Sequence, residues 1–337
     1  MAIKIKELGE MSKDPLVTIG IPTYNRADSF FPDALQCAVQ QSYGNIEIVV
    51  SDNCSTDSTQ DVVRSINDPR IRYFKQKSNI PATENFNFCL KKARGDYFSL
   101  LHDDDLLDED FVEACMYAAA GNKAIGLIRT GLRWIDNNGQ VLSEKKNTAA
   151  GLPLEEFFQA WFRGEIPMHL PSTLFNTRML AEIGGLSSRH QLFNDVIAEV
   201  KLAATHERLD VPDIKASFRH HPDRRTTADS IRFWCEDSLE LLDIMCHLAS
   251  DKCNSIRPDG IRFFVGHNLR LVRQVQSPLV QLRSYWMIYR YFQQPVSFLV
   301  KNVRYLVRSA LSEKLAGKNI PGSGNNRIDS KNNNKAG

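Results

Sequence analysis

The chain has 337 residues, of which 42% are hydrophobic and 24% charged, as in an ordinary soluble globular protein with one large domain or two. The net charge of +2 argues against a general affinity for nucleic acid, and no run of apolar residues is long enough to predict a transmembrane helix. The seven cysteines are scattered without a Cys-x-x-Cys motif, and residues 1–13 are polar without a signal-peptide core. These features predict a reducing, cytoplasmic location and no nucleic-acid partner.

Strand and helix signals alternate through the first 130 residues. Short apolar runs predict four strands, at Val17–Ile21, Ile46–Val50, Ile71–Phe74 and Tyr97–Leu101. The first of them should stop at Pro22, which lacks a backbone N–H. Apolar residues at helical spacing predict helices between the strands, near 31–39, 62–66 and 86–93. This order predicts an α/β fold whose mostly parallel sheet carries helices on both faces.

Polar clusters follow three of the predicted strands, at Pro22–Asn25, Ser51–Asn53 and His102–Asp105. Loops after parallel strands lie at the same edge of a sheet, where ligands of such folds bind. Each cluster taken alone could be a routine turn. Together they predict a ligand site at that edge.

The acidic run Asp103–Asp105 is the most informative of these clusters. Adjacent carboxylates repel one another and are hard to desolvate without a counter-charge. Carboxylate oxygens suit Mg²⁺ or Mn²⁺, which commonly sit between protein carboxylates and a substrate phosphate. The run therefore predicts a Mn²⁺ or Mg²⁺ site, and the alternative is a solvated acidic turn.

The remaining chain is less regular. A strand pair is expected around Asn137–Gly139, a helix at 154–162, a strand at 172–176, and helices from Asp229 onward. The Asn-, Gly- and Ser-rich end cannot bury apolar surface and is expected to be disordered. The predicted divisions are an extension at 1–14, a catalytic domain at 15–228 with halves 15–130 and 131–228, a helical region at 229–316, and a tail at 317–337.

Residues 256–311 carry nine Lys or Arg and one Asp, a net of +8. A helix near 296–311 has one apolar side, with Lys301, Arg304 and Arg308 on the other. Such a helix can lie on an anionic membrane surface. The alternative is that its apolar side packs inside the protein.

With these residues in place, the chain resembles the family 2 inverting glycosyltransferases of the GT-A fold, over about residues 15–225. Val17–Arg26 resembles the family's opening strand and nucleotide loop, and Val49–Asp57 its second strand with a base-binding Asp. His102–Leu107 resembles its metal-binding acidic motif. The segment from Gly184 to Asp195 resembles the acceptor-side loop and the catalytic Asp.

The resemblance implies transfer of a sugar from a nucleotide-diphosphate sugar to a hydroxyl of a saccharide or lipid-linked acceptor. The setting that it implies is bacterial cell-surface polysaccharide or O-antigen synthesis, at the inner face of the cell membrane. It makes Asp195 the catalytic base, which takes the proton of the acceptor hydroxyl. It implies metal ligands at Asp104, Asp103 and His221. The donor-binding residues that it implies are Pro22, Thr23, Tyr24, Asn25, Asp52, Asn85 and Asp103.

Two positions depart from the family pattern. Asn194 stands where the residue before the catalytic Asp is usually Glu, and His102 stands where many members carry the first Asp of an Asp-x-Asp motif. Other roles remain open for three residues: Asp52 or Asp195 could cap a helix, and His221 could belong to a surface loop.

Two other classes of protein compete with a glycosyltransferase. A metal-dependent nucleotidyltransferase needs a Gly-rich basic loop after its first strand, and none follows Ile21. A non-catalytic binder of sugar nucleotides or polysaccharide would have no need to keep Asp52, Asp103, Asp104 and Asp195 together.

Overall fold

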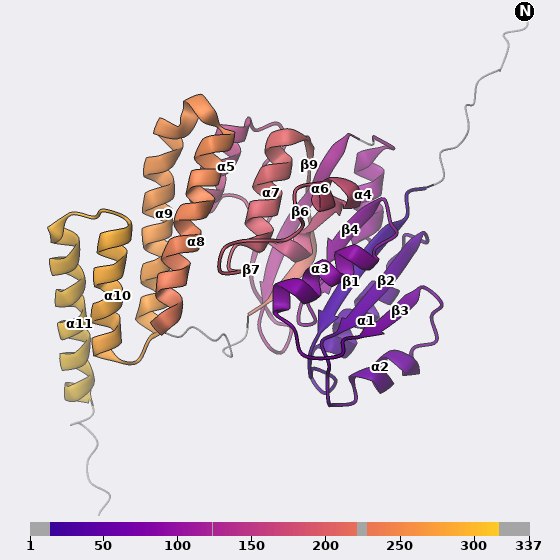
Figure 1. Ribbon diagram of the computed structural model, residues 1–337, viewed down its shortest axis with the longest axis horizontal. Helices are drawn as coiled ribbons and strands as arrows, with labels where there is room; N and C mark the ends of the chain where they lie inside the picture. The colour runs from indigo at the N-terminus through magenta and orange to yellow at the C-terminus, as the bar shows by residue number, and fades with distance from the viewer. Residues whose placement is uncertain (1–13, 123, 221–227, 317–337) are drawn as a thin grey trace, which may run out of the picture.

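A computed structural model describes residues 14–122, 124–220 and 228–316 of the chain. An α/β part with one large sheet forms one end of the molecule, and four long helices extend from it to the other end (Figure 1). The predicted architecture of an α/β fold followed by a helical region is confirmed.

The first half of the α/β part follows the predicted order. Its parallel strands lie side by side in the order β3-β2-β1-β4. Every residue of β1 and β2 is buried, because helices cover both faces of the sheet. The elements are β1 (Val17–Thr23), α1 (Phe31–Val39), β2 (Ile46–Asp52), α2 (Thr59–Ser65), β3 (Ile71–Lys75), α3 (Ala82–Lys92) and β4 (Tyr97–Leu100).

The end of β1 corrects one expectation. The strand does not stop at Pro22 but continues to Thr23, paired with Asp52 of β2. On its other side the pairing with β4 ends at Gly20 and Leu100. Beyond Gly20, β1 has no strand partner on the side of β4, so Pro22, which lacks an N–H, is tolerated there.

The second half makes the sheet mixed. β6 pairs in antiparallel fashion with β8 and in parallel fashion with β9, and β7 pairs with β6 around the predicted Asn-Asn-Gly turn. The helix at 154–162 is confirmed, whereas the long strand β9 was not expected. The elements are β5 (Leu106–Leu107), α4 (Phe111–Ala119), β6 (Ile125–Ile135), β7 (Val141–Lys145), α5 (Leu154–Phe162), the 3₁₀ turn at Leu170–Ser172, β8 (Thr173–Asn176), α6 (Thr177–Glu182), α7 (Asn194–Thr205) and β9 (Glu207–Arg219).

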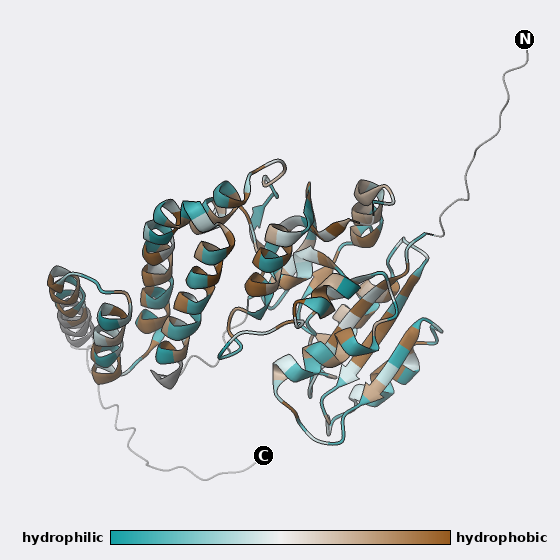
Figure 2. Cartoon of the chain, turned by 45° about the horizontal axis from the view of Figure 1, so that its top comes forward, coloured by the Kyte–Doolittle hydropathy of each residue, from teal (hydrophilic) through white to brown (hydrophobic). Residues whose placement is uncertain are grey.

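The C-terminal helices share a hydrophobic core with two helices of the sheet domain, α5 and α7. Trp161 of α5, for example, lies 4.6 Å from Phe263 of α9 between ring centroids. Hydrophobic residues dominate the central strands in Figure 2, whereas the C-terminal helices carry residues of both kinds. The division at residue 228 stays a prediction. The helices are α8 (Ala228–Leu248), a 3₁₀ turn at Ser250–Lys252, α9 (Cys253–Gln274), α10 (Pro278–Tyr291) and α11 (Val296–Ala316).

Within the described residues, no helix combines the length and apolarity that crossing a membrane requires. All seven cysteines are free thiols. The predicted disorder of residues 317–337 lies outside the described residues.

Candidate active site

The loops after β1 and β2 are bonded to each other. The backbone N–H of Asn25 donates to Ser55 Oγ at 2.9 Å, and Asn25 Oδ1 accepts from the N–H of Thr56 at 2.8 Å. Asp57 Oδ2 accepts from the N–H of Ala27 at 2.9 Å. Asn25 has a φ of 51°, a left-handed conformation that Asn tolerates better than most residues. The two polar clusters predicted to converge therefore form one surface.

Asp52 lies at the end of β2 with no exposed surface. Its Oδ1 accepts from the N–H of Ser55 at 2.7 Å, and its Oδ2 accepts from the hydroxyl of Tyr73 at 2.5 Å. Asp52 thus caps the turn after β2 and not helix α2, whose first residue bonds to Asp57. Its role in recognising a base stays a prediction.

The other predicted donor-binding residues divide into buried and exposed ones. Pro22 and Thr23 are buried within β1, while Tyr24 stands 43% exposed directly after it. Asn85 is buried in α3, where Oδ1 accepts from Ser51 Oγ at 2.6 Å and Nδ2 donates to the Ser51 carbonyl at 3.0 Å. The ring of Tyr24 is therefore accessible to a ligand, whereas the buried side chain of Asn85 connects α3 to β2.

The acidic loop after β4 lies beside the nucleotide loop. Asp103 Oδ2 accepts from the backbone N–H of Tyr24 at 3.4 Å. Burial, with the neighbouring Asp104 carboxylate, raises the pKa of Asp103 to about 6. The three predicted polar clusters therefore meet at the carboxyl ends of β1, β2 and β4.

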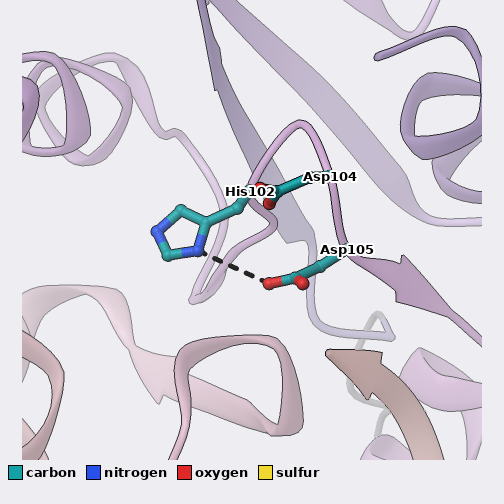
Figure 3. Close-up of side chains that lie close together, drawn as sticks. All are labelled: His102, Asp104 and Asp105. Carbon is teal, nitrogen blue, oxygen red and sulfur yellow. Dashed lines mark ion pairs between the residues drawn. The ribbon is translucent and has the colours of Figure 1, made fainter. Parts of the chain in front are cut away.

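His102, Asp104 and Asp105 form a group that fits a metal ion (Figure 3). One ligand atom from each lies within 4.8 Å of the other two. His102 Nδ1 is 3.4 Å from Asp105 Oδ2, and Asp105 Oδ1 accepts from the N–H of Arg219 at 2.9 Å. Burial disfavours the imidazolium, yet the Asp105 carboxylate raises the pKa of His102 to about 9.

One atom of this group supports the fit. Among the described residues, the buried Asp105 Oδ2 has no hydrogen-bond partner. Buried polar atoms are nearly always satisfied, so a cation bound between the carboxylates would satisfy it. His102 Nε2 also lacks a partner, but it points away from Asp105, which His102 faces with Nδ1 (Figure 3). The sequence predicted metal ligands at Asp104, Asp103 and His221 and did not name Asp105, although the third Asp of the run was a visible signal. His221 lies outside the described residues.

Asp195 lies in the first turn of α7, one residue inside the helix. Phe193 is the N-cap residue, so the alternative of Asp195 as a helix cap does not hold. Burial raises the pKa of Asp195, and the positive charge of His102 opposes that shift. Contacts of α3 connect the start of α7 to the acidic loop: Asn194, the residue before Asp195, donates to Thr83 Oγ1 at 2.8 Å, and the ring of Phe86 lies 5.1 Å from that of His102 between centroids.

A buried ionic network lies one turn further along α7. Arg129 of β6 is 1% exposed, and its Nε is 3.0 Å from Glu199 Oε2. Its guanidinium also lies 3.3 Å from Asp210 Oδ1 of β9, and Glu199 Oε1 accepts from the hydroxyl of Thr173 at 3.0 Å. Burial raises the pKa of Glu199 to about 7, against the opposing charge of Arg129. Sequence reasoning missed this network, because Arg129 stands in an apolar strand.

This fold is that of the GT-A glycosyltransferases. A crystal structure of TarS residues 1–349 from S. aureus in complex with UDP-GlcNAc superposes with a TM-score of 0.53 and 14% identity, over 88% of this chain and 92% of that one. Mannosyltransferase PcManGT from Pyrobaculum calidifontis, in complex with GDP-Man and Mn²⁺, superposes with a TM-score of 0.50 and 16% identity, over 90% of this chain and 88% of that one. At such identities the likeness shows the shared fold.

The sequence gives the family. Residues 18–182 match glycosyl transferase family 2. The chain is 29% identical over 143 residues to a chondroitin synthase of Escherichia coli, which covers 42% of this chain and 21% of that protein. It is 28% identical over 143 residues to a hyaluronan synthase of Pasteurella multocida, covering 42% and 14%. The matched part of the chain therefore spans 21% and 14% of the lengths of these two proteins.

Another relative is more similar in size. An uncharacterised glycosyltransferase of Methanocaldococcus jannaschii is 25% identical over 179 residues, which is 52% of this chain and 60% of that protein.

Proposed function

We propose that the protein is a metal-dependent, inverting glycosyltransferase that moves a sugar from a nucleotide-diphosphate sugar to a hydroxyl of a saccharide or lipid-linked acceptor. One observation carries the proposal. The contacts around one edge of the sheet support a shared site. The acidic loop bonds to the nucleotide loop through Asp103 and the N–H of Tyr24. Helix α3 contacts both the acidic loop, through Phe86 and His102, and the start of α7, through Thr83 and Asn194. This edge, at the carboxyl ends of parallel strands, is where such folds bind ligands.

Each group then has chemistry to perform. The exposed ring of Tyr24 can stack on the nucleotide base, and Asp103 holds the backbone of that residue in place. Asp195 takes the proton from the acceptor hydroxyl as the oxygen attacks the anomeric carbon, in a single displacement that inverts the configuration. A Mn²⁺ or Mg²⁺ ion held by Asp104, with His102 and Asp105 or Asp103, would neutralise the negative charge of the leaving diphosphate.

The comparisons support both partners of the reaction. The two structural neighbours are in complex with UDP-GlcNAc and with GDP-Man and Mn²⁺, which supports a nucleotide-sugar donor and a divalent metal. The names of the two synthases support a polysaccharide product.

The test is nucleotide release from UDP-GlcNAc, GDP-mannose and other nucleotide sugars, with Mn²⁺ or Mg²⁺ and a panel of saccharide acceptors. We expect one donor to be turned over with metal and to lose turnover in EDTA, and the anomer of the product to be inverted. Binding of a nucleotide sugar without any turnover would favour the non-catalytic alternative. A retained configuration would contradict the single displacement.

We also propose peripheral association with an anionic membrane surface, through α10 and α11. Leu279, Leu282 and Trp286 of α10 are 74%, 42% and 54% exposed, and Val296 and Val300 of α11 are 63% and 44% exposed. Among the residues of these helices whose side chains the structure describes, the exposed basic ones are Arg283, Arg290, Lys301 and Arg304.

The charge of this region favours an anionic partner. No acidic residue occurs between Asp259 and Glu313, so the basic side chains of α10 and most of α11 have no acidic neighbours in sequence. Each Lys or Arg near an anionic bilayer contributes about 1 kcal/mol, and exposed apolar side chains add to it. Leu299 and Leu306 of α11 instead pack on the shared core, so the apolar side of this helix is divided between packing and solvent.

Vesicle flotation of the full chain tests this proposal. We expect binding to anionic vesicles that weakens in high salt and is lost when Arg283, Arg290, Lys301 and Arg304 are all replaced by Gln. The matched control replaces four exposed basic residues elsewhere, and should bind like the parent: Arg64, Lys77, Lys91 and Arg178. Equal recovery with neutral and anionic vesicles, or self-association without any vesicle binding, would overturn the membrane role.

A further inference from the structure

The segment 186–193, here called the acceptor loop, leads from α6 into α7 and is held by one carboxylate of α8. Asp237 has no exposed surface. It accepts hydrogen bonds from the hydroxyl of Ser188 at 2.9 Å and from the backbone N–H groups of His190 at 2.9 Å and Leu192 at 3.1 Å. Among the described residues, no Lys or Arg forms an ion pair with it. Burying a lone carboxylate costs several kcal/mol, so these three donors must stay in place while α8 is packed.

Hydrogen bonds of Ser188 and Asn194 connect the acceptor loop to the start of α7. Ser188 Oγ accepts from the N–H of Phe193, the N-cap residue, at 3.3 Å and lies 3.0 Å from Asn194 Oδ1. Asn194 Nδ2 donates to Thr83 Oγ1 of α3 at 2.8 Å. Asp195 is the next residue. Asn194, at the position where the family usually carries Glu, thus connects the acceptor loop to helix α3.

Other residues of α8 hold the same loop from outside. The ring of His190 stacks on Phe233 with centroids 4.3 Å apart and planes at 18°, and its Nε2 is 2.6 Å from Glu236 Oε2. The N–H of Arg189 donates to Glu240 Oε2 at 3.0 Å. The acceptor loop therefore lies along successive turns of α8, and Asp237 is the buried residue of α8 to which it is hydrogen-bonded.

We propose that Asp237 is a positioning residue for sugar transfer. It fixes the acceptor loop, and through Ser188 and Asn194 it sets the direction in which Asp195 points toward the acceptor hydroxyl. The proposal rests on the proposed function, in which Asp195 is the base. It assigns the helical region, which lies beyond the residues that match the family, a part in the reaction.

The experiment compares Asp237→Asn with Asp243→Asn, a control on the same helix whose carboxylate pairs with Arg257 of α9 at 2.5 Å. The readouts are release of UDP from UDP-GlcNAc or of GDP from GDP-mannose, calorimetric binding of UDP or GDP, and hydrogen exchange of peptides. Displacing a reacting group by about 1 Å can cost about 100-fold in rate. We expect kcat to fall about 10- to 100-fold in Asp237→Asn, with donor KM and nucleotide affinity unchanged.

Exchange separates positioning from general destabilisation. Asp237→Asn should raise exchange in peptides of 186–195 and leave β1, β2 and β4 as protected as in the parent. A second variant, Ser188→Ala, keeps the two N–H donors of Asp237 and should lower kcat by a smaller factor. Asp243→Asn should match the parent in every readout.

Two results would overturn the positioning role. One is parental kcat and parental exchange in Asp237→Asn. The other is a fall in kcat accompanied by weaker nucleotide binding and faster exchange throughout the sheet, which indicates a merely structural residue. A failure of the proposed function would give a different result. In that case Asp195→Asn would release nucleotide at the parental rate, independently of hydrogen exchange in the acceptor loop.

Discussion

The α/β part has two halves, here called after their predicted roles the nucleotide half (β1 to β4) and the acceptor half (β5 to β9), and they are built in opposite ways. In the nucleotide half, each polar cluster directly follows a parallel strand, so the clusters meet at one edge of the sheet. In the acceptor half, the groups around Asp195 come from α7, β6 and β9, together with α8 of the C-terminal helices, and buried polar side chains join them. One half is organised by strand order and the other by long-range hydrogen bonds and ion pairs.

This difference predicts different kinds of failure. Substitutions in the nucleotide half should remove chemistry and leave the fold, because the polar side chains there sit at strand ends. Substitutions behind Asp195 should affect stability as well, because they leave buried charges without partners.

The largest effect on turnover is expected from Asp195→Asn. The substitution keeps the volume and removes the proton acceptor, so transfer should fall by about 10²- to 10⁴-fold. Nucleotide-diphosphate affinity, measured by calorimetry, should stay close to that of the parent. Asp61→Asn, an exposed position in α2, is the control. Loss of donor binding in Asp195→Asn would indicate that Asp195 binds the donor and is not the base.

Asp104→Asn should lower turnover by about 10²- to 10³-fold with the fold intact, because the charge that holds the cation is lost. The same loss should follow treatment of the parent with EDTA, and added Mn²⁺ should reverse only the latter. Asp33→Asn, exposed in α1, is the matched control. Transfer that persists in EDTA would contradict the metal assignment.

Arg129→Met tests the acceptor half through stability. Removing the guanidinium leaves the buried carboxylates of Glu199 and Asp210 without it, which should cost about 3–5 kcal/mol in the free energy of unfolding. Urea titration measures the change. Arg178→Met breaks an exposed pair with Glu182 and should change the free energy by less than about 1 kcal/mol. Equal values for the two variants would remove the contrast between the halves.

Glu236 should produce the smallest effect, in acid stability. Hydrogen bonds from Tyr291 and Arg232 lower its pKa from 4.5 to about 2. A depressed pKa stabilises the folded protein above about pH 4.5, and that contribution is lost as the pH falls toward 2. Thermal melts of Glu236→Gln should therefore lie below those of the parent at pH 7 and approach them near pH 2, while exposed Glu182→Gln follows the parent throughout. A gap that stays constant with pH would contradict the assignment.

The sequence was informative where local patterns decide the structure. The apolar runs of β1, β2 and β4 are buried strands, and the acidic run marks the group around Asp104. Strand β9 could not be predicted, because Glu207–Arg219 carries charged residues and Pro212 and becomes a strand by pairing with β6 and β5, which are distant in the sequence. Asp237 gave no signal either, because its donors belong to a loop some 45 residues away in the chain.

The core that α5 and α7 share with α8 and α9 limits how this protein can be recombined with its relatives. A chimera joined near residue 228 would set the C-terminal helices of one protein against the aromatic side chains of another, at contacts such as Trp161 with Phe263. Exchange of specificity between relatives would thus require α5 and α7 to travel with the C-terminal helices. In the evolution of this protein, α5, α7 and the C-terminal helices would then change together as one packed unit, although they are not continuous in sequence.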